Sequence, residues 1–270
     1  MEFPRPLSFL DVGWRHRRLI LRLARRKIES RYRGSILGSS WTLLQPLLML
    51  AVYTFVFGAV FQARWGLSDG AQTPFALVLF AGMIFYAVFA EPINEAPTLM
   101  TSNQGYIKQV LFPIEILPWV SLVAALFGFA VNMVLLFLFT LVLTGPPPWT
   151  AWLAPLLLIP LLLMALGMTW MLSAAGVFLR DLSQIVGVFT TALLFLSPIF
   201  YPADRIPDTF RPFYGLNPLV PLIEGFRALL FEGRLPEVRA MFFLLGLGWA
   251  TAWLGYFGFL RTKKGFADVL

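Results

Sequence analysis

The 270-residue sequence contains no cysteine and only one histidine, His16. Without cysteine the chain has no disulfides, no thiolate metal ligands and no cysteine nucleophile. A single histidine excludes a multi-histidine metal site. That histidine lies among arginines near the N-terminus, which also argues against a Ser-His-Asp triad.

Charge is the other scarce feature. Charged residues make up 13% of the chain and hydrophobic residues 59%, whereas an ordinary soluble domain is about 25% charged. A soluble domain with so few charges would expose large apolar patches, and a disordered chain would be more polar. The composition therefore indicates an integral membrane protein.

Long charge-poor segments predict an all-α membrane protein with six spans. A spanning helix needs roughly 20 apolar residues, and lipid offers no partner to the unpaired backbone groups of other structures. The charge-free run 116–179 is interrupted by Gly145-Pro146-Pro147-Pro148, which cannot continue a helix. The predicted spans are 36–62, 72–93, 116–143, 151–177, 182–201 and 239–260.

The basic residues predict the orientation of these spans. Ten of the 21 Lys and Arg residues lie in the first 35 positions, and Arg261, Lys263 and Lys264 follow the last span. Because Lys and Arg flank the cytoplasmic ends of membrane spans, we expect both termini in the cytoplasm. The basic start is not expected to be a cleavable signal peptide, because a full-length span follows it.

Residues 1–35 predict an amphipathic helix at the cytoplasmic membrane interface. Helical spacing puts apolar side chains on one arc, namely Leu10, Trp14, Leu21, Ala24, Ile28 and Tyr32. Arginines occupy another arc, namely Arg15, Arg18, Arg22, Arg26 and Arg33. The helix is expected to anchor the chain on anionic lipid, to receive an anionic headgroup, or both. Nucleic acid is not an expected partner of a helix held at a membrane.

Two stretches between the spans exceed a simple connector. In the inner stretch 94–118, Ser102 or Asn103 can cap a short helix that Pro113 ends, which predicts a docking element for another protein. The alternative is a plain connector.

In the outer stretch 201–238, helices are expected at 207–216 and 218–233, the second beginning at Asn217-Pro218 and ending at Gly233. The second has an apolar stripe, with Glu224 and Arg227 placed off it and able to pair. Because it is short for a bilayer, we expect a re-entrant pair packed against protein. An interfacial helical loop is the alternative.

Signals for catalysis or metal binding are absent from the sequence. There is no Gly-x-x-x-x-Gly-Lys-[Ser/Thr] loop, and the span interiors lack ionisable residues, which argues against an ion-coupled transporter. Glu91 and Glu95 are expected to be solvated or locally paired rather than metal ligands, and Pro207 between Asp204 and Asp208 favours a turn. We therefore expect no metal, no cofactor and no catalytic residue in this chain. The 27 Phe, 9 Trp and 7 Tyr residues suit a lumen that passes sugar rings, although most are expected in packing and interface belts.

Ordered motifs occur over nearly the whole chain. They are Arg31-Tyr32-Arg33-Gly34-Ser35-Ile36-Leu37-Gly38 with Trp41 and Pro46, then Asn103, Ile107-Lys108, Phe112-Pro113 and Ile116-Leu117-Pro118, then Arg180-Asp181-Leu182, then Ser197-Pro198-Ile199-Phe200-Tyr201-Pro202, and last Asn217-Pro218 with Glu224 and Arg227. In this order the motifs resemble the membrane subunit of ATP-binding-cassette exporters for lipid-linked polysaccharides, of the O-antigen and teichoic-acid permease type. The first motif looks most like the O-antigen branch.

The resemblance implies a homodimer of six-span subunits in the inner membrane, with two copies of a separate ATPase that binds ATP and Mg. The implied substrate is a glycan on a polyprenyl pyrophosphate carrier, which enters between the first and fifth spans and is threaded outward. Implied domains are an interface helix (1–35), a permease domain (36–262) with a coupling loop (94–115) and an outer gate segment (202–236), and a tail (263–270).

The resemblance also implies residue roles. Coupling to the ATPase falls to Gly105, Tyr106, Lys108, Phe112, Pro113, Arg180 and Asp181. The outer gate falls to Asn217, Pro218, Leu222, Glu224, Phe226 and Arg227. Lateral entry and the channel fall to Trp41, Tyr53, Ser197, Pro198 and Tyr201.

Other functions remain open at this point. The same fold could export teichoic acid, capsule, or a drug or small lipid. A polyprenyl-linked glycosyltransferase or phosphatase should show clustered carboxylates or a His/Arg set at one membrane face, which the sequence lacks. A structural scaffold would not need gate helices.

Overall fold

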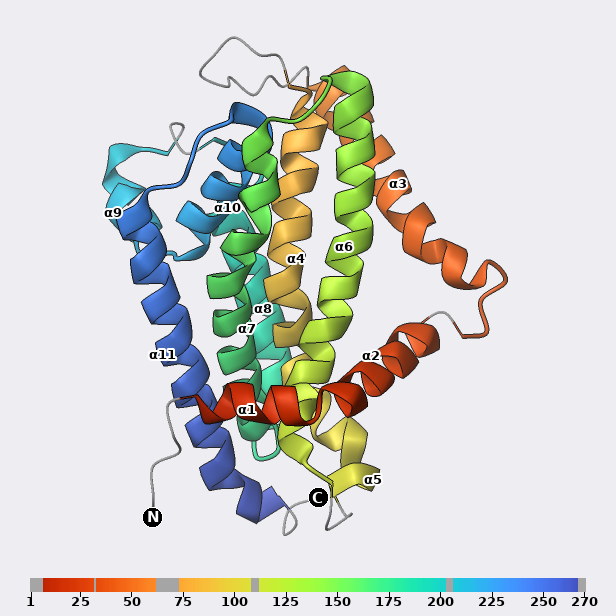
Figure 1. The fold of residues 1–270 in the computed structure, drawn as a ribbon, viewed down its shortest axis with the longest axis vertical. Helices are drawn as coiled ribbons and strands as arrows, with labels where there is room; N and C mark the ends of the chain where they lie inside the picture. The colour runs from red at the N-terminus through yellow and green to blue at the C-terminus, as the bar shows by residue number, and fades with distance from the viewer. Residues whose placement is uncertain (1–6, 32, 62–72, 108–111, 203–205, 267–270) are drawn as a thin grey trace.

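A computed structural model describes residues 7–31, 33–61, 73–107, 112–202 and 206–266, and these residues form helices and connections without any strand. Long helices stand side by side in a bundle, and two short ones, α1 (Ser8–Arg15) and α2 (Arg17–Arg31), cross its lower end (Figure 1). The end of α11 (Val238–Thr262) lies at the same lower end as α1 (Figure 1).

Apolar helices lie at all six predicted spans, and five helical segments are long enough to cross a membrane. The sixth, α8, has 15 residues and ends at Leu196, five residues before the predicted limit. Ser197 is extended because the residue before a proline disfavours the helical conformation, and Pro198 follows it. Apart from α11, the apolar helices are α3 (Trp41–Tyr53, continued by the π-helical Thr54–Val60), α4 (Phe75–Leu99), α6 (Leu117–Leu143), α7 (Ala154–Gly176) and α8 (Leu182–Leu196).

Helix α4 is the core of the bundle. It packs against α6, α7, α8 and the short outer helix α10 (Leu219–Arg227). Of the residues in its most apolar 18-residue stretch, 83% are buried. The helix continues to Leu99 through Pro92 and Pro97, so it extends beyond the predicted limit of 93. The inner loop is accordingly shorter than the sequence predicts.

The helices α7 and α11 approach each other through glycines. A Cβ on Gly167 would overlap the backbone of Thr251, and a Cβ on Gly255 would overlap the backbone of Gly167. Close approach of helix backbones through small residues is typical of membrane bundles.

The first apolar helix, α3, leans away from the bundle (Figure 1). Only 6% of the residues in its most apolar 18-residue stretch are buried, although the helix packs in part on α4 and α6. Gly34 and Gly38, both with positive φ, lie between α2 and α3 and allow the sharp change of direction.

The prediction of one continuous helix over 1–35 is wrong, because the chain breaks at His16 between α1 and α2. Of the predicted apolar arc, Ala24 is buried with Ile20 against Ile116 and Val120, whereas Trp14 is 72% exposed. Exposed apolar side chains on a helix at a membrane interface are available for contact with lipid. Leu10 and Leu21 are exposed as well, and Tyr32 lies outside the described residues.

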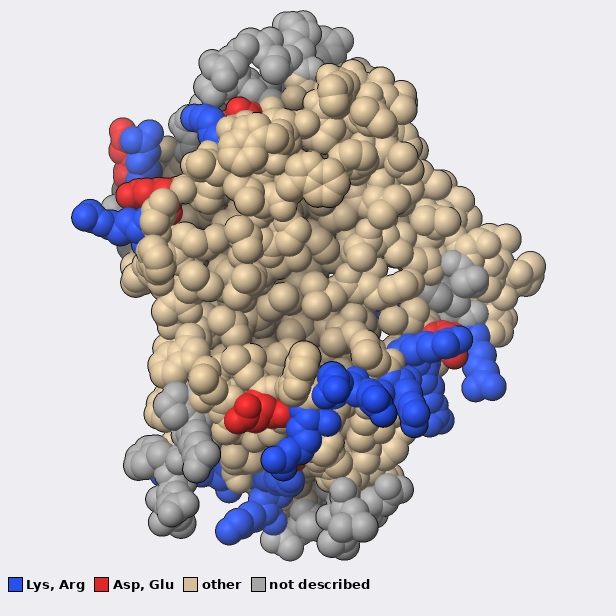
Figure 2. Space-filling model, in the orientation of Figure 1, with Lys and Arg blue, Asp and Glu red and all other residues tan. Residues whose placement is uncertain are grey.

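Charged side chains gather at the two ends of the molecule. On the face shown in Figure 2, Lys and Arg line the lower edge over α1 and α2, a smaller group of both signs lies at the upper left, and the wide band between is almost free of charge. All five predicted interface arginines are exposed, namely Arg15, Arg18, Arg22, Arg26 and Arg33. This banding is what a bilayer requires of a protein that crosses it.

Helices also occur in the outer stretch. A 3-10 turn at Asp208–Phe210 leads into α9 (Arg211–Gly215), and α10 continues as a π-helical turn over Ala228–Glu232. Gly233, with φ of 69°, ends this second helix at the predicted position.

Candidate functional site

The end of α8 and the start of α10 are joined by Asn217. Its Nδ2 donates to Ser197 Oγ at 3.1 Å, and its Oδ1 accepts from the Leu219 backbone N–H at 3.0 Å. The second bond satisfies one of the free N–H groups at the start of α10. Two motifs that are 20 residues apart in the sequence thus meet, with Pro198 beside one and Pro218 beside the other.

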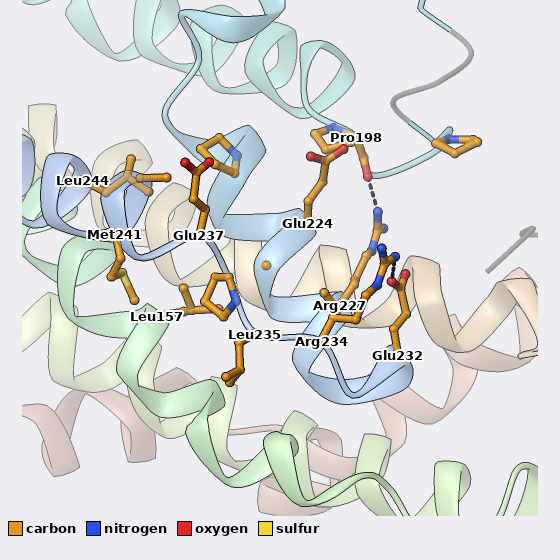
Figure 3. A pocket seen from close by; sticks show the side chains of 16 residues that line it. Leu157, Pro198, Glu224, Arg227, Glu232, Arg234, Leu235, Glu237, Met241 and Leu244 are labelled. Carbon is orange, nitrogen blue, oxygen red and sulfur yellow. Dashed lines mark hydrogen bonds and ion pairs between the residues drawn. The ribbon is translucent and has the colours of Figure 1, made fainter. Parts of the chain in front are cut away.

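Arg227 occupies the interior next to this junction. Only 4% of the residue is exposed, and its guanidinium donates to Val78 O at 2.9 Å, Ile199 O at 3.0 Å and Pro198 O (Figure 3). Hydrogen bonds from a charged donor are strong enough to offset much of the cost of burying the charge. Burial lowers the pKa of Arg227 to about 9, against the opposing effect of the Glu224 carboxylate, so the side chain stays protonated at neutral pH.

The prediction that Arg227 lies off the buried stripe is wrong. Arg227 follows Ile223 by four residues, so the two side chains share one face of α10, and that face meets the core. The four-residue spacing from Ile223 is the signal in the sequence that places Arg227 on this face.

Glu224, by contrast, is exposed and faces an outer cavity of about 490 Å³. Glu237 lines the same cavity, and so does the ion pair between Arg234 and Glu232 (Figure 3). Partial burial raises the pKa of Glu224, and the Arg227 charge counteracts part of that rise.

The apolar gate candidates on α10 are buried against the core. Leu222 and Phe226 are fully covered, and the Phe226 ring lies 4.5 Å from that of Phe85 on α4 and 6.1 Å from that of Phe129 on α6. The segment therefore packs as protein interior on one side.

A second cavity of about 770 Å³ lies between α8 and the outer segment, with mostly apolar walls. Tyr201 and Tyr214 contribute to its lining, and the Tyr201 hydroxyl donates to Phe195 O at 2.7 Å.

The predicted entry residues fall into two groups. Trp41 and Tyr53 lie on α3, where Trp41 Nε1 donates to Ser35 Oγ at 2.8 Å and Tyr53 packs against the core. Ser197, Pro198 and Tyr201 lie at the end of α8, where the first two are buried.

The predicted coupling residues Gly105, Tyr106, Phe112 and Pro113 lie in or near the four-residue helix α5 (Gln104–Ile107), at the lower end of the molecule (Figure 1). The Tyr106 and Phe112 rings stack with centroids 4.5 Å apart, and Arg26 Nη1 donates to the Tyr106 hydroxyl at 3.4 Å. Gly105 is exposed, and Pro113 precedes a 3-10 turn. Lys108 lies outside the described residues.

The turn between α7 and α8 supplies Arg180 and Asp181, both exposed. The Asp181 carbonyl accepts the Gln184 N–H at 3.1 Å at the start of α8. The turn follows the cytoplasmic end of α7 in the predicted topology.

Two ion pairs that the sequence did not predict join α2 to α4. Lys27 on α2 pairs with Glu95 on α4 and donates to Ser121 Oγ on α6 at 2.9 Å, while Arg31 pairs with Glu91 at 3.3 Å. Glu91 and Glu95 were expected to be solvated or paired locally, yet their partners come from another helix. The available signal was the matching four-residue spacing of both pairs.

Residues 18–231 match the family described as ABC-2 type transporter. The chain belongs to the ABC-2 type transporter family. The matched region runs from α2 into the π-helical turn after α10, so it contains both ion pairs between α2 and α4 and the junction formed by Asn217 and Arg227.

Individual relatives of this ABC-2 transporter match it over nearly their whole length. The "O-antigen export system permease protein RfbA" of Myxococcus xanthus is 28% identical, over 94% of this chain and 96% of the relative. The protein of the same name in Klebsiella pneumoniae is 26% identical, over 93% and 95%. The "Polysialic acid transport protein KpsM" of Escherichia coli is 23% identical, over 88% and 91%. The prediction of a membrane permease, rather than an enzyme, is thereby confirmed.

Proposed function

We propose that this chain is the membrane subunit of an ATP-driven exporter that moves a polyprenyl-pyrophosphate-linked polysaccharide of the O-antigen type across the inner membrane. The observation that carries the proposal is full-length similarity to O-antigen export permeases from two genera. The charge-poor bundle suits a channel through the membrane. The helical outer segment suits a gate, and the helical face at the other end suits contact with an ATPase.

The proposed assembly is a homodimer with two copies of a separate ATPase, which binds ATP and Mg. The chain has no phosphate-binding loop of its own. Both α3 and α8 carry exposed apolar side chains, such as Val188 at 72%, and a second copy would cover part of them. Both termini are proposed to be cytoplasmic, with the five interface arginines on anionic lipid.

Coupling to the ATPase is proposed at the face formed by α5 and the turn after α7. An ATPase element seated on Tyr106 and Phe112 would also bear on α2 through Arg26. The proposed coupling residues are Gly105, Tyr106, Lys108, Phe112, Pro113, Arg180 and Asp181.

Entry is proposed between α3 and α8, and release through the outer segment. The residues proposed along this route are Trp41, Tyr53, Ser197, Pro198 and Tyr201, of which the last three lie at the outer end of α8 beside the gate segment. We propose six spans, with α8 as the fifth, and segment 202–236 as a re-entrant gate that seals the channel between substrates. Its burial against α4 and α6 supports this role, because non-spanning backbone within a membrane needs protein around it.

Capsular polysaccharide is the second candidate substrate, and similarity to KpsM, named as a polysialic acid transport protein, supports a polysaccharide other than O-antigen. Deletion of the gene in its native organism tests both. We expect loss of surface O-antigen and accumulation of lipid-linked glycan inside the cell, reversed by the wild-type chain. Loss of capsule alone would favour the second candidate, and unchanged surface polysaccharide of both kinds would refute the proposal.

A further inference from the structure

Gly82 on α4 forms the wall against which the Arg227 guanidinium rests. A Cβ built on Gly82 would overlap that group, lying 3.1 Å from Cζ and 3.4 Å from Nε, and the three nearest heavy atoms all belong to Arg227. Among the described residues, no atom of another residue comes as near to this Cβ position as these three atoms of Arg227.

The space that the missing Gly82 side chain leaves for the guanidinium, which we call the Gly82 slot, lies beside one of the hydrogen-bond acceptors of Arg227. Val78, whose carbonyl accepts from Arg227 Nε, precedes Gly82 by one helical turn. The other two acceptors, Pro198 O and Ile199 O, lie just beyond the end of α8, where the chain has left the helix. One side chain from α10 thus links α4 with the end of α8.

A second contact joins the same elements. Asn217, just before α10, donates to Ser197 Oγ one residue after the end of α8. The start and the end of α10 are therefore both attached to the segment 197–199. A movement of α10 alone would break both attachments and leave buried carbonyls without donors, which is costly.

We propose that Gly82 is a positioning residue of the outer gate: by leaving room for Arg227 it joins α10, the end of α8 and α4, so that the gate opens by moving together with α8 rather than by a swing of α10. This inference rests on the proposed function, in which segment 202–236 seals the channel. Gly82 itself touches no substrate and acts through Arg227.

A double-mutant cycle in the reconstituted permease–ATPase complex tests the inference. Gly82→Ala places a methyl group where the guanidinium lies. Arg227→Gln shortens the side chain so that it leaves the slot while its amide remains near Val78 O. Gly128→Ala on α6 is the matched control, because a Cβ there meets nothing within 4 Å.

The measurement is ion leak through proteoliposomes without ATP, together with the melting temperature of each complex. We expect Gly82→Ala to raise the leak roughly tenfold, which corresponds to about 1.4 kcal/mol in the closed–open equilibrium, and Gly128→Ala to leave it unchanged. In the Arg227→Gln background, which leaks by itself, Gly82→Ala should add nothing. That lack of additivity distinguishes a direct contact from a general packing role of Gly82.

Two results would overturn the inference: a Gly82→Ala complex that leaks no more than Gly128→Ala, or an equal effect of Gly82→Ala in both backgrounds. Should Gly82→Ala fail to fold, recovery of folded complex by Arg227→Gln supports the slot, and absence of recovery refutes it. Glycan export by the wild-type complex is measured in parallel. Its absence would refute the proposed function, while the leak comparison would still judge the Gly82 slot.

Discussion

Arg227 is the only charged side chain that is buried among the described residues. Its three carbonyl acceptors, rather than a single carboxylate, hold it in place. Glu224 contributes as a nearby charge on the exposed side of α10. The two residues therefore do different work, and their substitutions should have unequal effects.

Replacement of Arg227 by Leu should lower the free energy of unfolding by about 3 kcal/mol, because buried carbonyls lose their donor. Glu224→Ala should cost about 1 kcal/mol or less, as for an exposed charge. The double variant should resemble Arg227→Leu alone. Denaturant unfolding in detergent measures all three. A double variant clearly more stable than Arg227→Leu would mean that Glu224 is the main partner after all.

At the scale of elements, the pairing of α7 and α11 depends on glycine. Gly255→Ala should destabilise the protein by about 2 kcal/mol, because the new methyl group would overlap the Gly167 backbone. Gly258→Ala on the same helix is the control, since a Cβ there meets nothing within 4 Å. That control should be neutral or slightly stabilising, as alanine favours a helix. Thermal unfolding in detergent compares the two, and equal melting temperatures would contradict the packing argument.

The helix α5, where coupling to the ATPase is proposed, is the second element that can be tested. Tyr106→Ala or Phe112→Ala should weaken ATPase binding by about 2 kcal/mol, as expected for a buried aromatic anchor, or uncouple hydrolysis from export. Because the two rings stack on each other, either change also leaves the other ring without its neighbour. Trp152→Ala, an exposed aromatic between α6 and α7, is the control. Binding and ATPase rates measured on purified complexes give the answer, and unchanged coupling in both variants would reduce this loop to a connector.

These elements also show what the sequence can and cannot predict. Hydropathy predicts the six long apolar helices, because each helix that crosses lipid needs a long run of apolar residues. Hydropathy places the end of α8 five residues too late, because the apolar run continues beyond Ser197-Pro198. The break at His16, the burial of Arg227 and the pairing of Lys27 with Glu95 depend on which helix faces which. Those relations arise only when the bundle assembles, and periodicity within one segment does not contain them.

In the whole molecule, the apolar helices have to be long enough to cross one bilayer, and the charged side chains have to lie outside its hydrocarbon core. Five helical segments are long enough to cross it, and α8 decides between five and six spans. As a helix of 15 residues, α8 is about 22 Å long, whereas the hydrocarbon core is about 30 Å thick. The residues 197–201 that follow would have to complete the crossing. Arg227 donates to the Pro198 and Ile199 carbonyls there, and Asn217 donates to the Leu196 carbonyl at the end of α8.

Cysteine labelling resolves the topology, because the chain has no native cysteine. Asp181 and Asp208 flank α8 and are both exposed. If α8 and its continuation cross the membrane, an impermeant reagent applied outside should label Asp208→Cys and leave Asp181→Cys unmodified. Ser102→Cys serves as the inner control and Trp152→Cys as the outer one, and lysis should make every site reactive. Labelling of Asp181→Cys and Asp208→Cys from the same side would give a five-span protein. The gate segment would then lie on the side of the ATPase and could not release a glycan outside.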